Sequence, residues 1–202
     1  MENDDTGKHD MLNSPGDTRL PAPADLASIW ALVYTERLVL RRPRAGDGPA
    51  LFAVDGDPAA TRYVLTGPDP DVTVSEARLQ RWLQHWEDQG YGYWAVMLPK
   101  TEHVIGFGGV IHQVWRERDV LNLYYRFTPS AWGQGYASEV ARMAIALAQA
   151  HLPPWPVIAR TRAGNIASQR TAERAGLKRR PDLDTEYLIL TLGWPSEDGF
   201  EN

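Results

Sequence analysis

A glycine-bearing loop that joins a strand pattern to a helix pattern constrains this fold more than any other feature of the chain. Residues 120–127 are rich in leucine and aromatic side chains, which indicates a strand. Residues 137–151 are rich in alanine and are followed by prolines, which indicates a helix with a sharp end. Gly133 and Gly135 lie between the two patterns. This order predicts a mixed fold in which a helix covers a sheet.

The remaining patterns place other strands and helices along the chain. Apolar runs bounded by turn residues predict strands over residues 37–41, 93–98, 104–110, 157–160, 177–180 and 186–192. Helical spacing of apolar residues predicts helices over residues 50–54, 75–90 and 168–175. Strands and helices follow one another with mixed connections, so we predict a single domain of the α+β, or mixed α/β, class.

The two ends of the chain differ in composition from the part between them. Residues 1–27 hold six acidic and two basic side chains and few apolar ones. Such a segment buries too little apolar surface to offset the loss of chain entropy. We therefore expect a flexible acidic tail over residues 1–27, a folded domain over residues 28–195 and a short C-terminal tail over residues 196–202.

The charge of the chain argues against nucleic acid as a partner. Lys and Arg total 21 against 26 Asp and Glu, so the formal net charge is −5. Residues 1–27 account for most of this negative charge, which leaves the expected domain close to neutral. A nucleic-acid-binding domain needs a basic excess, which is absent from this sequence.

Cysteine content and hydropathy exclude further classes of function. The chain has no cysteine, which excludes disulfides, thiolate zinc sites and a cysteine nucleophile. No apolar run is long enough to cross a bilayer, and the acidic start of the chain is unlike a secretion signal. We expect no metal, no membrane partner and a cytoplasmic location.

The glycine loop has a second property that bears on function. Glycines let a ligand approach the backbone closely, and the amides of residues 133–137 lie at the positive end of the predicted helix. Such amides can donate hydrogen bonds to a pyrophosphate. The loop lacks the third glycine of a dinucleotide fingerprint and the Gly-Lys-Ser/Thr ending of a P-loop. On the spacing alone, a phosphate cradle and a simple chain turn both stay open.

Three segments give the chain a resemblance to a known family. They are residues 35–47, residues 125–137 with the loop Trp132-Gly-Gln-Gly135, and residues 165–177 with an Asn-x-x-Ser start. These segments resemble the opening strand, the central strand with its pyrophosphate loop, and the following helix of the GNAT superfamily of acyl-CoA-dependent N-acyltransferases. The resemblance is closest to the RimJ/RimL-like branch of ribosomal-protein N-terminal acetyltransferases.

The resemblance implies a fold and an activity. The fold would contain a central mixed sheet of about six to seven strands, splayed at the acyl-CoA site and flanked by about four helices. The activity would be transfer of an acetyl group from acetyl-CoA to a primary amine by direct attack in a ternary complex. The acceptor stays open between a protein N-terminus and a small-molecule amine, and the protein between a monomer and a homodimer. The alternative is a catalytically idle acyl-CoA-binding regulatory module on the same fold.

The same resemblance assigns residues to the cofactor. The backbone of Arg126 and Phe127 would face the thioester in the splayed strand pair. The full set that the resemblance implies for CoA is Arg126, Phe127, Trp132, Gly133, Gln134, Gly135, Tyr136, Ala137, Asn165, Ser168 and Arg170. Three further arginines, Arg160, Arg162 and Arg174, lie in or near the adenine-side elements, and a solvated face explains them equally well.

Four side chains are candidates for a catalytic role: Ser168, His112, Asn122 and Tyr187. In this branch the serine of Asn-x-x-Ser lies near the sulfur, so Ser168 would donate to the departing thiolate; Asn165 and Ser168 would equally well cap a helix. His112 titrates in the range of a general base, or is a polar surface residue. Asn122, where many relatives have Glu, would bind the amine or a water. Tyr187 would donate to the sulfur, or pack as an ordinary strand residue.

Overall fold

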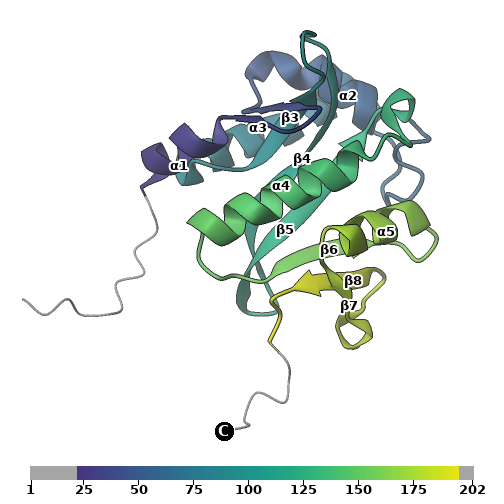
Figure 1. Cartoon of the computed structure of the whole chain (residues 1–202). Helices are drawn as coiled ribbons and strands as arrows, with labels where there is room; N and C mark the ends of the chain where they lie inside the picture. The colour runs from purple at the N-terminus through teal and green to yellow at the C-terminus, as the bar shows by residue number, and fades with distance from the viewer. Residues whose placement is uncertain (1–21, 196–202) are drawn as a thin grey trace, which may run out of the picture.

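The computed structural model describes residues 22–195, which form a mixed sheet with helices on both faces (Figure 1). The strands are β1 (Leu32–Tyr34), β2 (Val39–Arg41), β3 (Tyr93–Met97), β4 (Val104–Trp115), β5 (Arg118–Phe127), β6 (Val157–Thr161), β7 (Lys178–Arg179) and β8 (Leu188–Leu192). The helices are α1 (Pro23–Trp30), α2 (Gly48–Asp55), α3 (Val72–Gln89), α4 (Tyr136–His151) and α5 (Ile166–Arg174). Residues 1–21 and 196–202 of the expected tails lie outside the described residues.

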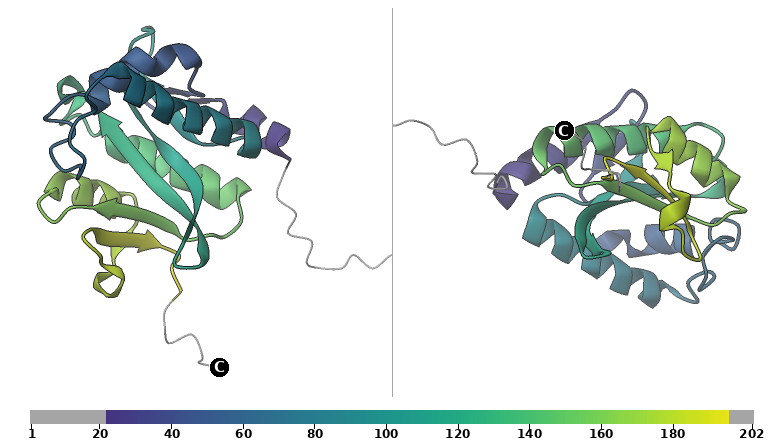
Figure 2. Two further views of the ribbon diagram at one scale, coloured as in Figure 1. Left: turned by 180° about the vertical axis from the view of Figure 1, so that it is seen from behind. Right: turned by 90° about the horizontal axis from the view of Figure 1, so that it is seen from below.

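The eight strands follow the order β1-β2-β3-β4-β5-β6-β8-β7. Neighbouring strands are antiparallel, except that β5 and β6 are parallel. In Figure 1, α4 and α5 lie in front of the sheet, and the rear view in Figure 2 shows α2 and α3 across its other face. The view from below places the sheet between these two layers. None of the helices in the described range is both long and apolar enough to span a membrane.

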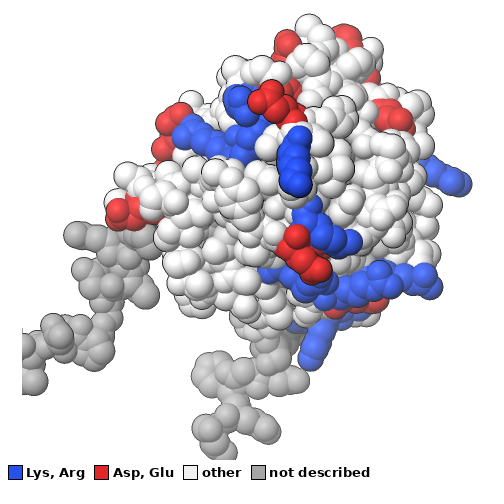
Figure 3. All heavy atoms as spheres, turned by 45° about the horizontal axis from the view of Figure 1, so that its top comes forward, with Lys and Arg blue, Asp and Glu red and all other residues white. Residues whose placement is uncertain are grey.

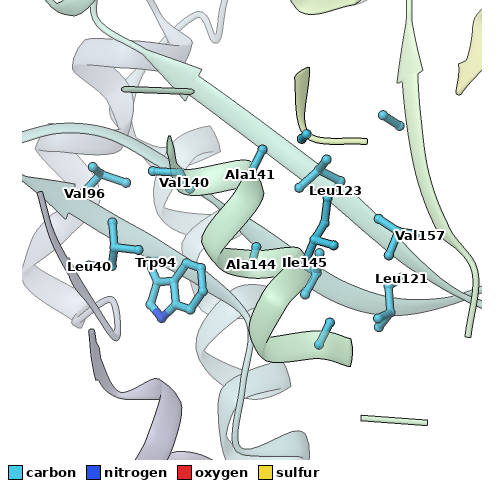
Figure 4. Packing of buried hydrophobic residues seen from close by; sticks show 14 of the residues in the cluster. Leu40, Trp94, Val96, Leu121, Leu123, Val140, Ala141, Ala144, Ile145 and Val157 are labelled. Carbon is cyan, nitrogen blue, oxygen red and sulfur yellow. The ribbon is translucent and has the colours of Figure 1, made fainter. Parts of the chain in front are cut away.

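The helix α4 buries one face against the centre of the sheet. Val140, Ala141 and Ala144 recur at the spacing of a single helix face and are fully buried. They pack in one cluster with Leu123 of β5, as Figure 4 shows. Small alanine side chains let the helix approach the sheet closely.

On the opposite face, α3 begins earlier than the predicted start at Ser75. Asp71 is the N-cap, because its carboxylate accepts a hydrogen bond from the Thr73 amide at 2.9 Å. Ser75 is instead buried within the first turn of the helix and donates to Asp69 at 2.7 Å. The prediction placed the start too late because Asp71 lies upstream of the apolar residues that define the helical pattern.

The structure confirms the expected α+β class and the mixed sheet, and adds one helix and one strand at the start of the described chain. The helix α1 begins at Pro23, inside the range expected to be a tail, and β1 follows it. Leu26 and Trp30 of α1 are buried in the main core. The Trp30 carbonyl also accepts a hydrogen bond from Trp94 Nε1 at 2.7 Å. Burial of these two large side chains offsets the polar composition around them.

The parallel strands β5 and β6 pair at two positions and then separate, as expected for a splayed sheet. Leu121 pairs with Val157, and Asn122 pairs with Ile158. Beyond these positions β5 stays paired with β4, while β6 stays paired with β8. We call the opening between β5 and β6 the fork. One edge of β5 therefore faces an opening inside the sheet.

Candidate active site

The loop between β5 and α4 holds two glycines in a backbone conformation that other residues rarely adopt. Gly133 and Gly135 have φ angles of 75° and 77°, in the left-handed region. A Cβ at Gly133 would have no neighbour within 4 Å, and one at Gly135 would lie 3.6 Å from the Arg37 guanidinium. The space above Gly133 is therefore open, and a Cβ at Gly135 would make one ordinary van der Waals contact.

Six successive main-chain amides of this loop have no acceptor among residues 22–195. They are the amides of Gly133, Gln134, Gly135, Tyr136, Ala137 and Ser138. The next amide, that of Glu139, donates to the Gly135 carbonyl at 3.2 Å. No side chain caps α4 at Gly135. Free donors therefore gather at the positive end of a helix of 16 residues, where an anion is favoured.

Arg37, which precedes β2, holds the loop from the side. Its Nη1 donates to the Gln134 carbonyl at 2.8 Å, and its Nε donates to Glu139 Oε2 at 2.8 Å. Glu139 also accepts from the Thr35 hydroxyl at 2.6 Å. Burial raises the pKa of the Glu139 carboxyl, but the hydrogen bonds from Thr35 and Arg37 outweigh burial and hold the pKa below its usual range. Sequence reasoning missed this contact, because 102 residues separate the two partners.

A cavity of about 640 Å³ connects the loop with the fork. Its wall includes residues of the loop, β5, β6 and α5, and of the connection between α2 and α3. The expected site residues on this wall are Arg126, Phe127, Trp132, Gly133, Gly135, Tyr136, Ala137, Asn165, Ser168, Arg170 and Tyr187. Gln134, His112 and Asn122 do not line it. The volume is in the range of small-molecule sites.

The backbone of β5 presents alternate residues to the fork. The Thr128 amide donates to a carbonyl of β4 at 3.0 Å, and the Leu121 amide donates to a carbonyl on the β6 side at 2.9 Å. Backbone groups of successive strand residues point to opposite sides, so Tyr125 and Phe127 face the fork and Arg126 faces β4. The prediction for the Arg126 backbone is therefore wrong, and Tyr125 takes its place beside Phe127.

Asn165 and Ser168 lie at the start of α5, on the cavity wall. Asn165 Oδ1 accepts from the Ser168 amide at 3.1 Å, which makes Asn165 the N-cap of the helix. The Tyr125 hydroxyl lies 2.8 Å from the Ser168 carbonyl and 3.3 Å from the Ser168 hydroxyl. Burial raises the pKa of Tyr125 to about 12, so this hydroxyl stays protonated at neutral pH. The structure thus adds Tyr125 to the candidates near Ser168.

The side of β5 that faces α2 carries a buried ion network. Asp55 of α2 is 1% exposed and pairs with Arg126 Nη1 at 2.6 Å and with Arg78. The Tyr124 hydroxyl lies 3.4 Å from the same carboxylate, and Arg78 also pairs with Asp69 at 2.8 Å. Burial lowers the pKa of Arg126, but Tyr124 and Asp55 raise it by more, so the guanidinium stays charged. The network holds the side chains of Tyr124 and Arg126 in place at the cavity wall.

The structure does not bring His112 to the cavity. His112 lies inside β4, and its Nε2 is 2.6 Å from Asp119 Oδ1. Its ring packs on Trp155 with 4.6 Å between ring centres. These partners belong to the end of the sheet where β5 begins, whereas the fork opens toward the end of β5. This position of His112 favours its interpretation as a polar surface residue over that of a general base.

Asn122 and Tyr187 differ in whether they line the cavity. Asn122 Nδ2 donates to the Tyr93 hydroxyl at 2.6 Å, and its Oδ1 accepts from Arg160 Nη2 at 3.1 Å. Asn122 therefore holds Arg160 and does not itself reach the cavity wall. Tyr187 does line the wall, under the Arg162 guanidinium, which lies 5.8 Å from the ring centre.

Basic side chains gather on one part of the surface. In Figure 3, Lys and Arg side chains extend across the lower right of the face shown, with fewer acidic side chains among them. Within the described range, the cavity wall itself includes five arginines and no Asp, Glu or His. This distribution suits a ligand with several negative charges.

Comparison with known proteins identifies the family. The family model for the acetyltransferase (GNAT) domain matches residues 37–178, which is more than half of the chain. The chain therefore belongs to the GNAT acetyltransferases, which transfer acetyl groups from acetyl-CoA. One relative, the uncharacterized N-acetyltransferase p20 of Bacillus licheniformis, is 27% identical over 113 residues, or 56% of this chain. The match spans 63% of that relative, which is less than two thirds of its length.

Solved structures of acetyltransferases share the fold. The acetyltransferase of Agrobacterium tumefaciens strain C58 superposes with a TM-score of 0.68 and 25% identity, over 92% of this chain and 99% of the other. RimL, a ribosomal L7/L12 alpha-N-protein acetyltransferase solved with coenzyme A, has a TM-score of 0.63 and 16% identity, over 79% of this chain and 95% of the other. These likenesses confirm the GNAT fold.

Proposed function

We propose that this protein transfers an acetyl group from acetyl-CoA to a primary amine by direct attack in a ternary complex. The observation that carries the proposal is one cavity that runs from the free amides of the loop to the fork. Amides at a helix N-terminus bind phosphate, and an unpaired strand edge can hold an extended ligand through main-chain hydrogen bonds. CoA has these two parts, a pyrophosphate and an extended arm.

The residues present fit acetyl-CoA, which would supply the acetyl group as an activated thioester. The amides from Gly133 to Ser138 would hold the pyrophosphate, and the open space above Gly133 admits it. Arg170 would add positive charge at α5, while Arg37 would hold the loop in place through the Gln134 carbonyl. The edge of β5 that faces the fork would hold the extended arm.

The acceptor amine would approach from the α2 side of the fork, where Tyr124, Arg126 and Tyr187 line the wall. Direct attack needs a neutral amine, and a protein α-amine with a pKa of about 8 already provides some of that form at neutral pH. Since the wall within residues 22–195 has no carboxylate or histidine, positioning would carry most of the catalysis. The Ser168 hydroxyl, beside that of Tyr125, would donate to the departing sulfur.

We also propose that the protein belongs to the RimJ/RimL-like branch. The loop Trp132-Gly-Gln-Gly135 and the motif Asn165-x-x-Ser168 support this, as does the structural likeness to RimL. The acceptor would then be a protein N-terminal α-amine or a small-molecule amine. The second candidate function is an acyl-CoA-binding regulatory module without activity, and it is favoured by the absence of Asp, Glu and His from the part of the wall that residues 22–195 form.

Two measurements separate these functions. Calorimetry measures acetyl-CoA binding, and release of free thiol measures turnover with a panel of peptide amines and small amines. We expect binding together with thiol release that depends on an acceptor. Binding without thiol release from any acceptor would identify the regulatory module. Absence of binding would refute both functions.

A further inference from the structure

The five arginines of the cavity wall belong to two sides of the fork. They are Arg126, Arg160, Arg162, Arg170 and Arg174. Arg170 and Arg174 belong to α5, on the face of the sheet that α4 also covers. Of the other three, Arg126 lies in β5, Arg160 in β6 and Arg162 directly after β6, on the face toward α2, where the proposed acceptor approaches. The charge on that second side bears on the chemistry of the acceptor.

Contacts place Arg160 on the side of the sheet that faces α2. Arg160 Nη2 donates to Gln113 Oε1 at 3.0 Å and to Asn122 Oδ1 at 3.1 Å. Asn122 in turn donates to Tyr93, whose ring meets Trp82 of α3 edge to face at 5.2 Å. The guanidinium therefore lies on the face of the sheet that α2 and α3 cover.

Arg162 lies on the same side, nearer the mouth of the fork. Its guanidinium is over the Tyr187 ring, and its Nη1 donates to the Glu186 carbonyl at 3.1 Å. It also lines a second hollow together with residues 62–65, which connect α2 to α3. Arg162 thus stands between the acceptor side of the cavity and the surface.

Arg160 and Arg162 have neutral partners only. Within the described range, neither forms a salt bridge with an Asp or Glu side chain. Arg126 differs, because Asp55 neutralises it at 2.6 Å. The acceptor side of the cavity therefore keeps two positive charges that no carboxylate of the described chain balances.

We propose that the acceptor is an amine that carries a carboxylate or similar anion a few bonds from its nitrogen, and that Arg160 and Arg162 bind this anion. The assignment rests on the proposed acetyl transfer. A guanidinium binds a carboxylate through two parallel hydrogen bonds, and both side chains are accessible to a ligand, since Arg160 is exposed and Arg162 half-buried. The same cations disfavour an ammonium group nearby, so they favour the neutral amine that attack requires. A polyamine would be repelled.

The test uses the full chain and two matched pairs of acceptors that differ in charge. Glycine and glycinamide form the small-molecule pair. Two amidated tetrapeptides with serine first, and aspartate or asparagine second, form the N-terminal pair. We expect kcat/KM to be at least about tenfold greater for the carboxylate-bearing member of at least one pair. The pair that shows this preference identifies the source of the amine.

Variants test whether the two arginines cause the preference. Arg160→Gln and Arg162→Gln should each reduce it to about twofold or less, with acetyl-CoA affinity unchanged. Arg170→Gln is the matched control within the cavity, and should weaken acetyl-CoA binding while the preference persists. Arg142→Gln, on the exposed side of α4, should alter neither quantity.

Different results would overturn different conclusions. Equal kcat/KM within both pairs for the unmodified protein would overturn the anionic acceptor and leave acetyl transfer in place. If both Arg160→Gln and Arg162→Gln keep the preference for the carboxylate-bearing acceptor, these arginines do not cause it. An absence of thiol release from every acceptor, with acetyl-CoA bound, would overturn the proposed function itself.

Discussion

Gly135 meets three structural demands at one position. Its φ of 77° is left-handed, it precedes the first residue of α4, and a Cβ there would lie 3.6 Å from the Arg37 guanidinium. Most helices satisfy their first amides with a side-chain cap, and α4 has none among the described residues. A phosphate group would satisfy them instead, so the missing cap is consistent with a binding site.

Replacing Gly135 by glutamate should abolish acetyl-CoA binding, because the carboxylate would occupy the space in front of the free amides. The fold should survive, since the new side chain would lie next to Arg37. Calorimetric titration with acetyl-CoA measures the loss. Gly135→Asn is the control, because asparagine tolerates the left-handed conformation without adding charge, and it should still bind. Unchanged affinity in Gly135→Glu would contradict a phosphate site at this loop.

Ser168 is the residue where a catalytic and a structural role are most easily confused. Ser168→Ala removes the hydroxyl near Tyr125 but keeps the carbonyl and amide contacts of the backbone. We expect kcat to fall about tenfold or more while acetyl-CoA affinity stays within about twofold. Thiol release gives kcat, and calorimetry gives the affinity. Equal losses in kcat and in acetyl-CoA affinity would make Ser168 a binding residue.

At the scale of elements, α5 shows how a helix cap and a ligand site share the same end. The helix has nine residues, which is too short to be stable alone in water. It depends on the Asn165 cap and on burial of Ala172 against the core. Because Ser168 lies in the first turn, any shift of this turn would move it relative to the fork.

Replacing Asn165 by alanine should destabilise the protein by about 1 kcal/mol, because the Ser168 amide loses its acceptor. For a chain of this size the melting temperature should fall by roughly 2 to 4 °C. Asn165→Asp keeps an oxygen at the cap and should restore the melting temperature. If Asn165→Asp is stable yet inactive, the Asn165 amide group has a role in the reaction beyond the cap.

At the scale of the whole molecule, the site depends on contacts between distant parts of the chain. Glu139 in α4 joins Thr35 and Arg37, which precede β2, to the first turn of the central helix. Arg37 then reaches the Gln134 carbonyl and holds the loop. The start of the described chain therefore supports the site without lining the cavity.

Glu139→Gln should lower stability at neutral pH and make it less sensitive to acid. The pKa of Glu139 is lower in the folded protein than in the unfolded chain, where it is about 4.3. Its contribution is therefore present above that unfolded pKa, and is lost as pH falls through the lower folded pKa. Urea denaturation at a series of pH values from 7 to about 3 measures how the free energy of unfolding depends on pH.

The control for this variant is Glu87→Gln, which removes an ion pair with Arg42 at a carboxylate that is 67% exposed. Exposed pairs contribute little, so its denaturation midpoint should stay near that of the unmodified protein. If Glu139→Gln and the unmodified protein lose the same amount of stability as the pH falls, Glu139 is not the group that makes the protein sensitive to acid.

Local sequence patterns predicted the parts of the site that depend on neighbouring residues. The glycine loop, the free amides and the start of α5 at Asn165 all follow from spacings within a few residues. Patterns failed where a position depended on partners far along the chain. His112 is of a residue type that often serves as a general base, yet the register of β4 places it at the other end of the sheet from the opening of the fork.

The amino-acid sequence by itself determined the α+β class, the glycine loop between a strand and a helix, and the resemblance to GNAT proteins. Only the tertiary structure decided which backbone groups of β5 face the fork, that Arg37 and Glu139 support the loop, and that Arg160 and Arg162 lie on the α2 side of the cavity. The physical reason is how far apart along the chain the interacting residues lie. A glycine turn or a helix cap is stabilised within one turn of chain, whereas the side of a sheet that a residue faces depends on strand register and on helices packed from elsewhere.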